Sequence, residues 1–218
     1  MNKTLIIPGG SKGIRRSIAI KFAKNNFDIY TCSRNQDELN KLESEIKSIN
    51  PKIKVSTLVS DLSRKEGSLN FIDFVIKNTN KIDVLVNNAA HDDRHNWQEV
   101  TEDYWDERFA TNLRHQFFTI QSVAKDMIQK GGGSIINIGS NSWMEAVGNF
   151  PAYATAKSAV HGLSRTLARD LGQHRIRVNT VVPGWIMTDR QKELWVTPEG
   201  LENQYKRQCL PDLIKPVY

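Results

Sequence analysis

Thr4–Ile14 reads TLIIPGGSKGI, an apolar run that passes directly into a turn with three glycines. The run predicts a buried strand, and the residues after it predict a helix over about Lys12–Asn25. A glycine-rich turn between strand and helix lets the backbone approach a pyrophosphate, whose charge then lies at the helix N-terminus. The candidate phosphate-binding residues are Gly9, Ser11, Lys12, Gly13 and Ile14.

Strand-length apolar runs and longer helical segments alternate along the rest of the chain. The predicted strands are Thr4–Pro8, Asp28–Ser33, Val55–Val59, Val84–Asn87, Ser134–Gly139 and Val178–Val182. The later predicted helices are a segment capped by Asn35 and ending at Ile49, then Ser68–Asn78, Thr101–Ala110, Leu113–Gln129, and Tyr153–Leu171 with Gly172 as its stop. Repeated βα units imply a doubly wound, parallel α/β sheet with helices on both faces. We expect one Rossmann-like domain over residues 1–218.

The composition excludes several other classes. With 39% hydrophobic and 25% charged residues, the chain resembles an ordinary globular protein. Its net charge of +6 comes from dispersed Lys and Arg residues, so we expect no nucleic-acid partner. No apolar run reaches the ~18 residues of a membrane span, and no signal segment is evident, so we expect a cytoplasmic protein. The two cysteines, Cys32 and Cys209, form no metal-binding motif, and we expect no metal.

The end of the second predicted strand bears on the choice of cofactor. Ser33 and Arg34 stand there, where a fold that prefers NAD would usually place Asp or Glu to bind the ribose 2′-hydroxyl. A hydroxyl and a guanidinium suit a 2′-phosphate instead, and Lys12 is available from the glycine turn. We therefore expect NADP(H), with NAD(H) as the alternative.

Tyr153 and Lys157 stand four residues apart at the start of a predicted helix, so both side chains project from one face. A phenol, with a reference pKa near ~10, is a poor proton shuttle at neutral pH. A neighbouring ammonium group favours the phenolate and brings the phenol towards its working range.

At this point the chain resembles the short-chain dehydrogenases/reductases over essentially its whole length. The matching segments are the turn at 9–13, Asp61-Leu62, Asn87–Ala90, Asn112, Ser140, Tyr153–Lys157, and Pro183-Gly184 with Thr188. The resemblance implies that Tyr153 is the general acid/base, that Lys157 lowers its pKa and binds the nicotinamide ribose, and that Ser140 hydrogen-bonds the substrate oxygen. Asn112 would hold a water that links Lys157 to solvent.

The same resemblance implies the remaining cofactor contacts. They are Asp61 and Leu62 at the adenine, Asn88, Ala89 and Ala90 at the floor of the cofactor site, and Pro183, Gly184, Ile186 and Thr188, of which Ile186 and Thr188 would meet the carboxamide. The second half is more narrowly similar to the members that oxidise aldoses at C1. It implies a polar and aromatic sugar pocket formed with Ser140 and Tyr153 by Asp93, Arg94, His95, Asn141, Trp143 and Trp185.

Three departures from the family pattern bear on activity. Pro8 stands where the family usually has Thr, and Arg15 stands in place of its third glycine. Arg15 must either swing outward or crowd the cofactor. No seventh strand is evident after Gly184, so we expect the carboxyl end to be truncated and the last strand to be missing.

Three functions remain open. The first is an NAD(P)-dependent oxidoreductase that acts on a small alcohol or carbonyl compound, such as an aldose, and assembles as a homo-oligomer if the missing end is supplied. The second is an NADPH-dependent carbonyl reductase, such as a 3-oxoacyl thioester reductase. The third is a degenerate relative with weak or no activity. Tyr153, Lys157, Ser140 and Asn112 argue against the third function, whereas Pro8 and Arg15 argue for it.

Overall fold

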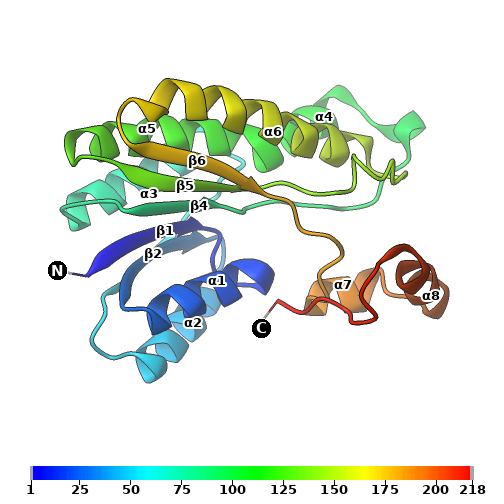
Figure 1. The fold of residues 1–218 in the computed structure, drawn as a ribbon, viewed down its shortest axis with the longest axis horizontal. Helices are drawn as coiled ribbons and strands as arrows, with labels where there is room; N and C mark the ends of the chain where they lie inside the picture. The colour runs from blue at the N-terminus through cyan, green and yellow to red at the C-terminus, as the bar shows by residue number, and fades with distance from the viewer. Residues whose placement is uncertain (1, 217–218) are drawn as a thin grey trace.

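The computed structural model describes residues 2–216 as one parallel sheet of six strands in the order β3-β2-β1-β4-β5-β6, with helices on both faces (Figure 1). The strands are β1 Lys3–Pro8, β2 Phe27–Ser33, β3 Val55–Val59, β4 Val84–Asn87, β5 Gly133–Ile138 and β6 Ile176–Val181. The helices are α1 Gly13–Lys24, α2 Gln36–Ile49, α3 Lys65–Asn78, η1 Trp97–Glu99, α4 Glu102–Phe109, η2 Ala110–Arg114, α5 His115–Gln129, α6 Pro151–Gly172, α7 Asp189–Leu194 and α8 Pro198–Arg207. The doubly wound α/β fold expected from the sequence is confirmed.

Side-chain alternation along the strands produces two cores. Leu5 and Ile7 of β1 point to a cluster with α1 and α2, whereas Ile6 points to a cluster with α3, α5 and α6. Figure 1 shows these two helical layers on opposite sides of the sheet. Because both faces of the central strands are covered, these strands are almost entirely apolar.

The strand register brings the candidate site together. β1 pairs with both β2 and β4, and β4 pairs with β5 so that Asn87 lies opposite Asn137. Strands β2 and β3 are added on one side of β1, whereas β4, β5 and β6 are added on its other side, so the strand order reverses between β1 and β4. A crevice forms outside the carboxyl ends of the strands at such a switch point. The glycine turn after β1 and the segments after β4 and β5 all open into it.

Most element bounds agree with the sequence within one or two residues, including those of α6, which begins at Pro151 and has Gly172 as its last residue. Three other features differ. Helix α3 begins three residues earlier than expected, at Lys65. The two helices expected between residues 101 and 129 form one run joined by the π-helical turn η2. Helix α8 was not expected; most of its residues are polar, and none of them is buried.

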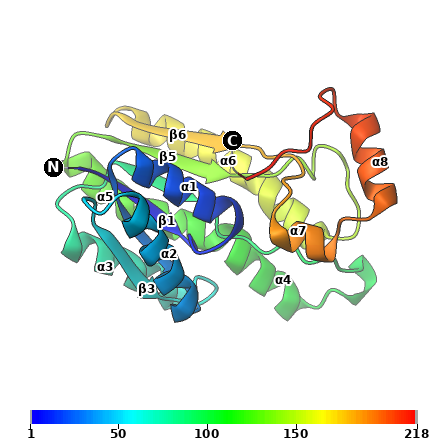
Figure 2. The same cartoon turned by 90° about the horizontal axis from the view of Figure 1, so that it is seen from below.

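Residues after β6 form a separate arm beside the carboxyl ends of the strands. Figure 2 shows α7 and α8 on the side of the molecule where the strands end, with the chain returning toward the sheet after α8. The amide of Met187 donates to the carbonyl of Ile214 at 2.8 Å, which ties the returning segment to the loop before α7. No strand follows β6 within residues 2–216. None of the helices described combines the length and apolarity needed to cross a membrane.

Candidate active site

The glycine turn is held against β2 by hydrogen bonds. The amide of Gly10 donates to Thr31 Oγ1 at 2.9 Å, and Thr31 Oγ1 donates to the carbonyl of Ile7 at 2.7 Å. A Cβ on Gly10 would lie 2.5 Å from Thr31 Oγ1, so only glycine fits. Gly9 and Gly13 have φ of +74° and +57°, a region that favours glycine. Because no side chain caps α1, its first amide groups are available to an anion.

Arg15, which replaces the third glycine, points into the turn rather than outward. Its Nη1 lies 2.9 Å from the position of a Cβ on Gly9, and its side chain lines the same cleft as Tyr153 and Lys157. Burial lowers the pKa of Arg15, and the charge of Arg15 also lowers the pKa of Lys157. Of the two positions expected for the side chain of Arg15, outward or toward the cofactor site, the structure shows the second.

Lys12 and Arg34, the two cations expected to bind a 2′-phosphate at the end of β2, differ in their contacts. The ammonium group of Lys12 is 2.7 Å from Glu38, whose carboxylate also accepts from Ser11 at 2.9 Å. Partial burial raises the pKa of Glu38, but the hydrogen bonds from Lys12 and Ser11 outweigh it and hold this pKa below its usual value. Arg34 is exposed and has no hydrogen bond or ion pair within residues 2–216, so its charge is available to a ligand. Glu38 was missed in the sequence because we interpreted it only as part of a helix cap.

The segments after β3 and β4 contribute differently to the crevice. Asp61 accepts hydrogen bonds from the amide and hydroxyl of Ser63 at 3.0 and 2.7 Å, and Leu62 packs against the apolar core. Asn88 and Ala90 line the cleft beside the glycine turn. Ala89 lies beneath it, where its carbonyl is 3.0 Å from His115 Nε2. Of the expected adenine and floor residues, Asn88 and Ala90 therefore line the main cleft, whereas Asp61, Leu62 and Ala89 lie outside its lining.

Tyr153, Lys157 and Ser140 meet where β5 ends and α6 begins, as the sequence predicts. All three line one cleft of about 1240 Å³ that also contains the glycine turn. Lys157 is almost fully buried, and its Nζ donates to the carbonyl of Ile138 at 2.6 Å. The same Nζ lies 5.8 Å from the centre of the Tyr153 ring. Ser140 Oγ donates to Ser142 Oγ at 2.9 Å, which orients the Ser140 hydroxyl.

Burial shifts the pKa values of Tyr153 and Lys157 in opposite directions. It raises the pKa of Tyr153 to about 12, with Asp92 adding to the rise, whereas hydrogen bonding with Ser140 and the charge of Arg94 oppose it. Burial, with help from Arg15, lowers the pKa of Lys157 to about 7. Both groups therefore favour their uncharged forms more than they would in water.

Asn112 lies in the π-helical turn η2, fully buried and outside the cleft lining. Its Oδ1 accepts from the amide of His91 at 2.8 Å, and its Nδ2 donates to the carbonyls of His91 and Arg108 at 3.2 and 2.8 Å. The side chain thus fixes the loop after β4, which carries the next group of candidate residues. π-helical turns are frequent at functional sites.

The expected sugar-binding residues divide into two groups. Arg94, Asn141 and Trp185 line the cleft together with Ser140 and Tyr153. Asp93, His95 and Trp143 lie outside its lining. Asp93 pairs with Arg190 of α7. His95 Nε2 accepts from the amide of Ala152 at 3.2 Å, while its Nδ1 is 2.9 Å from the hydroxyl of Tyr104. Trp143 packs edge-on against His161, with ring centres 5.2 Å apart.

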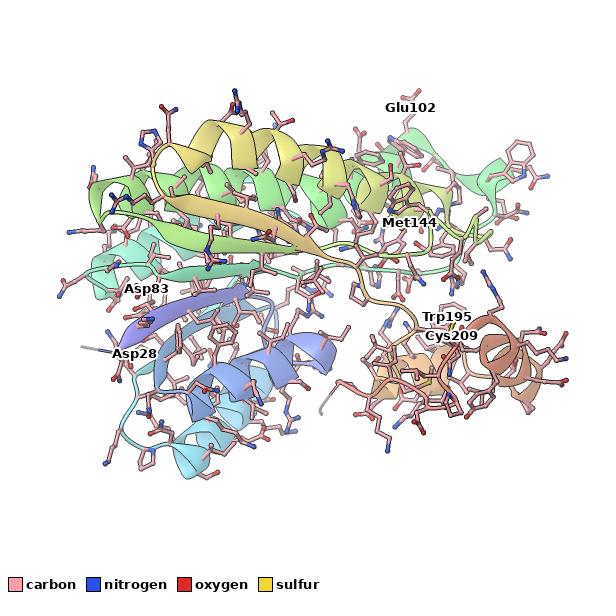
Figure 3. All side chains as sticks on the ribbon, in the orientation of Figure 1. Asp28, Asp83, Glu102, Met144, Trp195 and Cys209 are labelled. Carbon is pink, nitrogen blue, oxygen red and sulfur yellow. The ribbon has the colours of Figure 1, made fainter. Side chains whose placement is uncertain are left out.

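The cleft residues that were missed in the sequence include Asp92, Phe150, Gln191 and Trp195. Gln191 Nε2 donates to Asp92 at 2.6 Å, and Trp185 Nε1 donates to Gln191 at 2.8 Å. Figure 3 shows Trp195 on the arm after β6 and Met144 on the loop after β5. The contact between Gln191 and Asp92 joins segments about a hundred residues apart, so no local pattern could indicate it. The adjacent pair Asp92-Asp93 was the available signal.

The loop after β6 closes the other side of the cleft. Pro183, Gly184, Ile186 and Thr188 all line it, as expected. Thr188 caps α7 by accepting from the amide of Gln191 at 3.3 Å. A Cβ on Gly13 would lie 3.5 Å from Thr188 Cγ2, so this loop faces the glycine turn directly.

The cleft has the chemistry of a dinucleotide site. The uncapped amides of α1 suit a pyrophosphate at one end, and polar groups of Ser140, Tyr153 and Lys157 converge at the other. The side chain of Arg15 projects into the space beside Gly9 of the turn. A doubly wound sheet with these features at its switch point defines a dinucleotide-dependent oxidoreductase.

Comparison with known proteins agrees with this class. The short chain dehydrogenase family matches residues 3–199, and the chain therefore belongs to this family of NAD(P)-dependent oxidoreductases. D-xylose 1-dehydrogenase of Caulobacter vibrioides is 40% identical over 216 residues, covering 98% of this chain and 84% of that protein. A 3-oxoacyl-acyl-carrier-protein reductase of Staphylococcus epidermidis is 32% identical over 198 residues, covering 89% and 79% of the two chains.

Solved structures show the same fold. A 7α-hydroxysteroid dehydrogenase complexed with NADH and a 7-oxo bile acid superposes with a TM-score of 0.92 at 30% identity. The match covers 98% of this chain and 82% of that chain.

Proposed function

We propose that this protein oxidises the C1 hydroxyl of an aldose, with Tyr153 as the proton-transferring residue. The observation that carries the proposal is the convergence of Tyr153, Lys157 and Ser140 in one cleft with the glycine turn. The similarity to D-xylose 1-dehydrogenase supports an aldose as the substrate. The polar and aromatic groups of Arg94, Asn141 and Trp185 in the same cleft suit the hydroxyls and apolar ring face of a sugar.

When bound, a nicotinamide dinucleotide accepts the hydride from the substrate carbon. Ser140 Oγ orients the reacting oxygen by a hydrogen bond, and Tyr153 Oη takes its proton. Lys157 would bind the ribose next to the nicotinamide. When its ammonium group is protonated, Lys157 also stabilises the phenolate of Tyr153. Asn112 keeps the loop after β4 in place through its contacts with His91. The enzyme's contribution is positioning and proton transfer.

We also propose that NADP(H) is preferred over NAD(H). Arg34 supports the preference, because its exposed guanidinium at the end of β2 is not bonded to a carboxylate within the described residues. Lys12 supports it less than expected, since Glu38 already binds its ammonium group. A guanidinium suits a 2′-phosphate because it can donate two parallel hydrogen bonds.

A panel of aldoses tests the substrate. The purified protein is mixed with each sugar and with NADP⁺ or NAD⁺, and reduced nicotinamide is followed by its absorbance. We expect turnover with a pentose or hexose aldose and none with the matching alditol, which lacks an anomeric carbon. Turnover of a 3-oxoacyl thioester with NADPH, and none of any aldose, would favour the carbonyl reductase suggested by the staphylococcal relative.

Cofactor binding tests the third alternative directly. Titration with NADPH and NADH, followed by reduced-nicotinamide fluorescence, requires no knowledge of the substrate. We expect saturable binding of at least one of them. If neither binds, the chain is a degenerate relative, and Pro8 and Arg15 are the first residues to revert.

We further propose that the protein acts in the cytoplasm and assembles as a homo-oligomer. The exposed aromatic side chains of Trp105, Phe117 and Phe118 on α4 and α5 support self-association, because such side chains are enriched at interfaces. Light scattering of the purified protein tests the assembly, and fractionation of the source cells tests the location.

A further inference from the structure

Arg94 lies in the loop after β4 and lines the cleft beside Tyr153. Its guanidinium carbon is 3.9 Å from the ring centre of Phe150 and 5.3 Å from that of Trp195. Phe150 in turn stacks on Tyr153, with ring centres 5.4 Å apart and an interplanar angle of 21°. Three segments, the loop after β4, the start of α6 and the end of α7, thus hold one cation near the proton-transferring phenol.

The charge of Arg94 is not neutralised by a bonded carboxylate. Arg94 has no ion pair within residues 2–216, and its Nη1 is a buried donor without a partner in this part of the chain. The nearby carboxylate of Asp92 is bonded instead by Gln191 at 2.6 Å and by Arg190 at 3.5 Å. Aromatic faces attract the guanidinium without removing its charge. The positive field of Arg94 therefore remains available to a neighbouring anion.

Lys157 alone is a weak source of positive charge in this site. Its Nζ is engaged with the carbonyl of Ile138, and its pKa lies at about 7 because of burial and the charge of Arg15. It is therefore charged only part of the time at neutral pH. A guanidinium does not lose its proton under these conditions. Among the charges that shift the pKa of Tyr153, Asp92 raises it and Arg94 lowers it.

We propose that Arg94 is a positioning residue for the reaction: its clamped guanidinium stabilises the phenolate of Tyr153 from the substrate side of the cleft, and Asp92 opposes it. The proposal rests on the proposed role of Tyr153 in proton transfer. It assigns to Arg94 an electrostatic task that the family resemblance assigns to Lys157. It also explains why Phe150 and Trp195 flank the guanidinium, since together they fix where its charge lies.

Charged and titratable groups reach Tyr153 from several elements. They are Asp92, Arg94 and His95 of the loop after β4, Arg15 of α1, which acts on Lys157, Lys157 itself in α6, Arg190 of α7 through Asp92, and the cleft-lining pair Glu145 and Arg207. His95 accepts a hydrogen bond at Nε2 from Ala152, so that nitrogen is unprotonated. Glu145 and Arg207 are 3.0 Å apart and largely cancel each other. Asp92 and Arg94 therefore remain as the pair with opposite effects on Tyr153.

The pH dependence of aldose oxidation tests the proposal in four proteins: the parent, Arg94→Met, Arg94→Lys and Asp92→Asn. The rate should rise with pH as Tyr153 ionises. In Arg94→Met the ascending limb of the pH–rate profile should move to higher pH by roughly one unit. At a fixed pH on this limb the rate is then about tenfold lower than in the parent. Arg94→Lys should return the profile most of the way to that of the parent, and Asp92→Asn should move the ascending limb to lower pH. Shifts of the same sign in Arg94→Met and Asp92→Asn, or no shift in Arg94→Met, would overturn the proposal.

A measurement without turnover separates electrostatics from folding. The ultraviolet difference spectrum of phenolate is recorded against pH in the cofactor-free proteins, with Tyr153→Phe as the background for the other tyrosines. At a given alkaline pH, Arg94→Met should show less ionised Tyr153 than the parent, and Asp92→Asn more. A purely structural role for Arg94 would lower the thermal stability and the rate without moving this titration. If Tyr153→Phe retains full turnover, the proposed function fails. If it loses turnover while Arg94→Met titrates like the parent, only the inference on Arg94 fails.

Discussion

The side chain of Lys157 is almost fully buried, and within residues 2–216 its ammonium group donates to the carbonyl of Ile138. Burial lowers its pKa from 10.5 in the unfolded chain to about 7 in the fold. Between these two values the unfolded state binds more protons than the folded state, so stability increases with pH in this window. Below about pH 7 the destabilising effect of burial is fully present.

Lys157→Met tests this linkage. The variant removes the titrating group but also the bond to Ile138, so the absolute change in stability is not diagnostic. We expect its stability relative to the parent to be most favourable below about pH 7 and to decline as the pH rises toward 10.5. Denaturant unfolding at several pH values measures the difference. A difference that does not vary with pH would show that Lys157 keeps its ordinary pKa.

Arg34→Ala tests the choice of cofactor at the same scale. Loss of the guanidinium should weaken NADPH far more than NADH, because a charge-assisted bond to the 2′-phosphate contributes about 1.5–3 kcal/mol. Fluorescence titration with both reduced cofactors measures this, and Arg64→Ala is a matched control on the neighbouring loop. Equal weakening of the two cofactors would show that Arg34 does not bind the 2′-phosphate.

Individual site residues were predictable to different degrees. Tyr153, Lys157 and Ser140 were found because a short spacing and the end of a strand place them together. Asp93, His95 and Trp143 were assigned to the sugar pocket from the family resemblance and from residue type, and their side chains instead contact α7, Ala152 and His161. Asp92, Phe150 and Trp195 were missed because their contacts cross between distant segments. Residue type indicates chemistry, but only packing decides which face of a loop meets the cleft.

Helix α1 carries the departure with the clearest consequence for binding. Arg15 lies in its first turn, and Nη1 is 2.9 Å from where a Cβ on Gly9 would be. A cation can pair with a pyrophosphate, but it cannot restore the space that a glycine leaves for close approach of the backbone. Sterics and charge therefore oppose each other, and the inward position of the side chain favours sterics.

We expect Arg15→Gly to tighten cofactor binding. Glycine inside a helix costs roughly 1 kcal/mol relative to Ala, so Arg15→Ala separates the lost side chain from the weakened helix. Arg16→Ala is the matched control, because Arg16 in the same turn pairs with Glu45 instead. Fluorescence titration measures the affinities. Weaker binding by both Arg15 variants, with Arg16→Ala unchanged, would show that Arg15 holds the phosphates.

Secondary structure was largely predictable where the pattern is local. Asn35 caps α2 as expected, accepting from the amides of Asp37 and Glu38. The carboxylate of Glu38, in the first turn of α2, binds Lys12 and Ser11 of the glycine turn. The π-helical turn at Asn112 was not predictable, because it depends on contacts with the loop after β4.

At the scale of the whole molecule, β6 forms one edge of the sheet in the described residues and β3 forms the other. An unpaired edge strand can pair with another chain. Val181 of β6 is 50% exposed, and Val59 of β3 is 49% exposed. The parallel, doubly wound sheet was predictable from the alternating pattern, whereas the order of its strands and the exposure of its edges come from the tertiary structure.

We expect low solubility or non-native oligomers that form through β6. Val181→Lys should reduce this association, because a charge on an edge strand opposes pairing with another chain. Val59→Lys, at the opposite edge and with similar exposure, is the matched control. Light scattering against concentration measures both variants. Association that is as strong in Val181→Lys as in the parent would contradict this expectation.

The Tyr153→Phe variant tests the central claim most directly, because it removes one hydroxyl from the site and keeps the ring that packs on Phe150. Turnover with the best aldose and affinity for the reduced cofactor are measured side by side in the variant and the parent. The account predicts that turnover falls by roughly 10²–10⁴-fold, the usual contribution of general acid–base catalysis, while cofactor affinity stays nearly unchanged. A variant that keeps more than about half of the parent rate would contradict the assignment of Tyr153 to proton transfer.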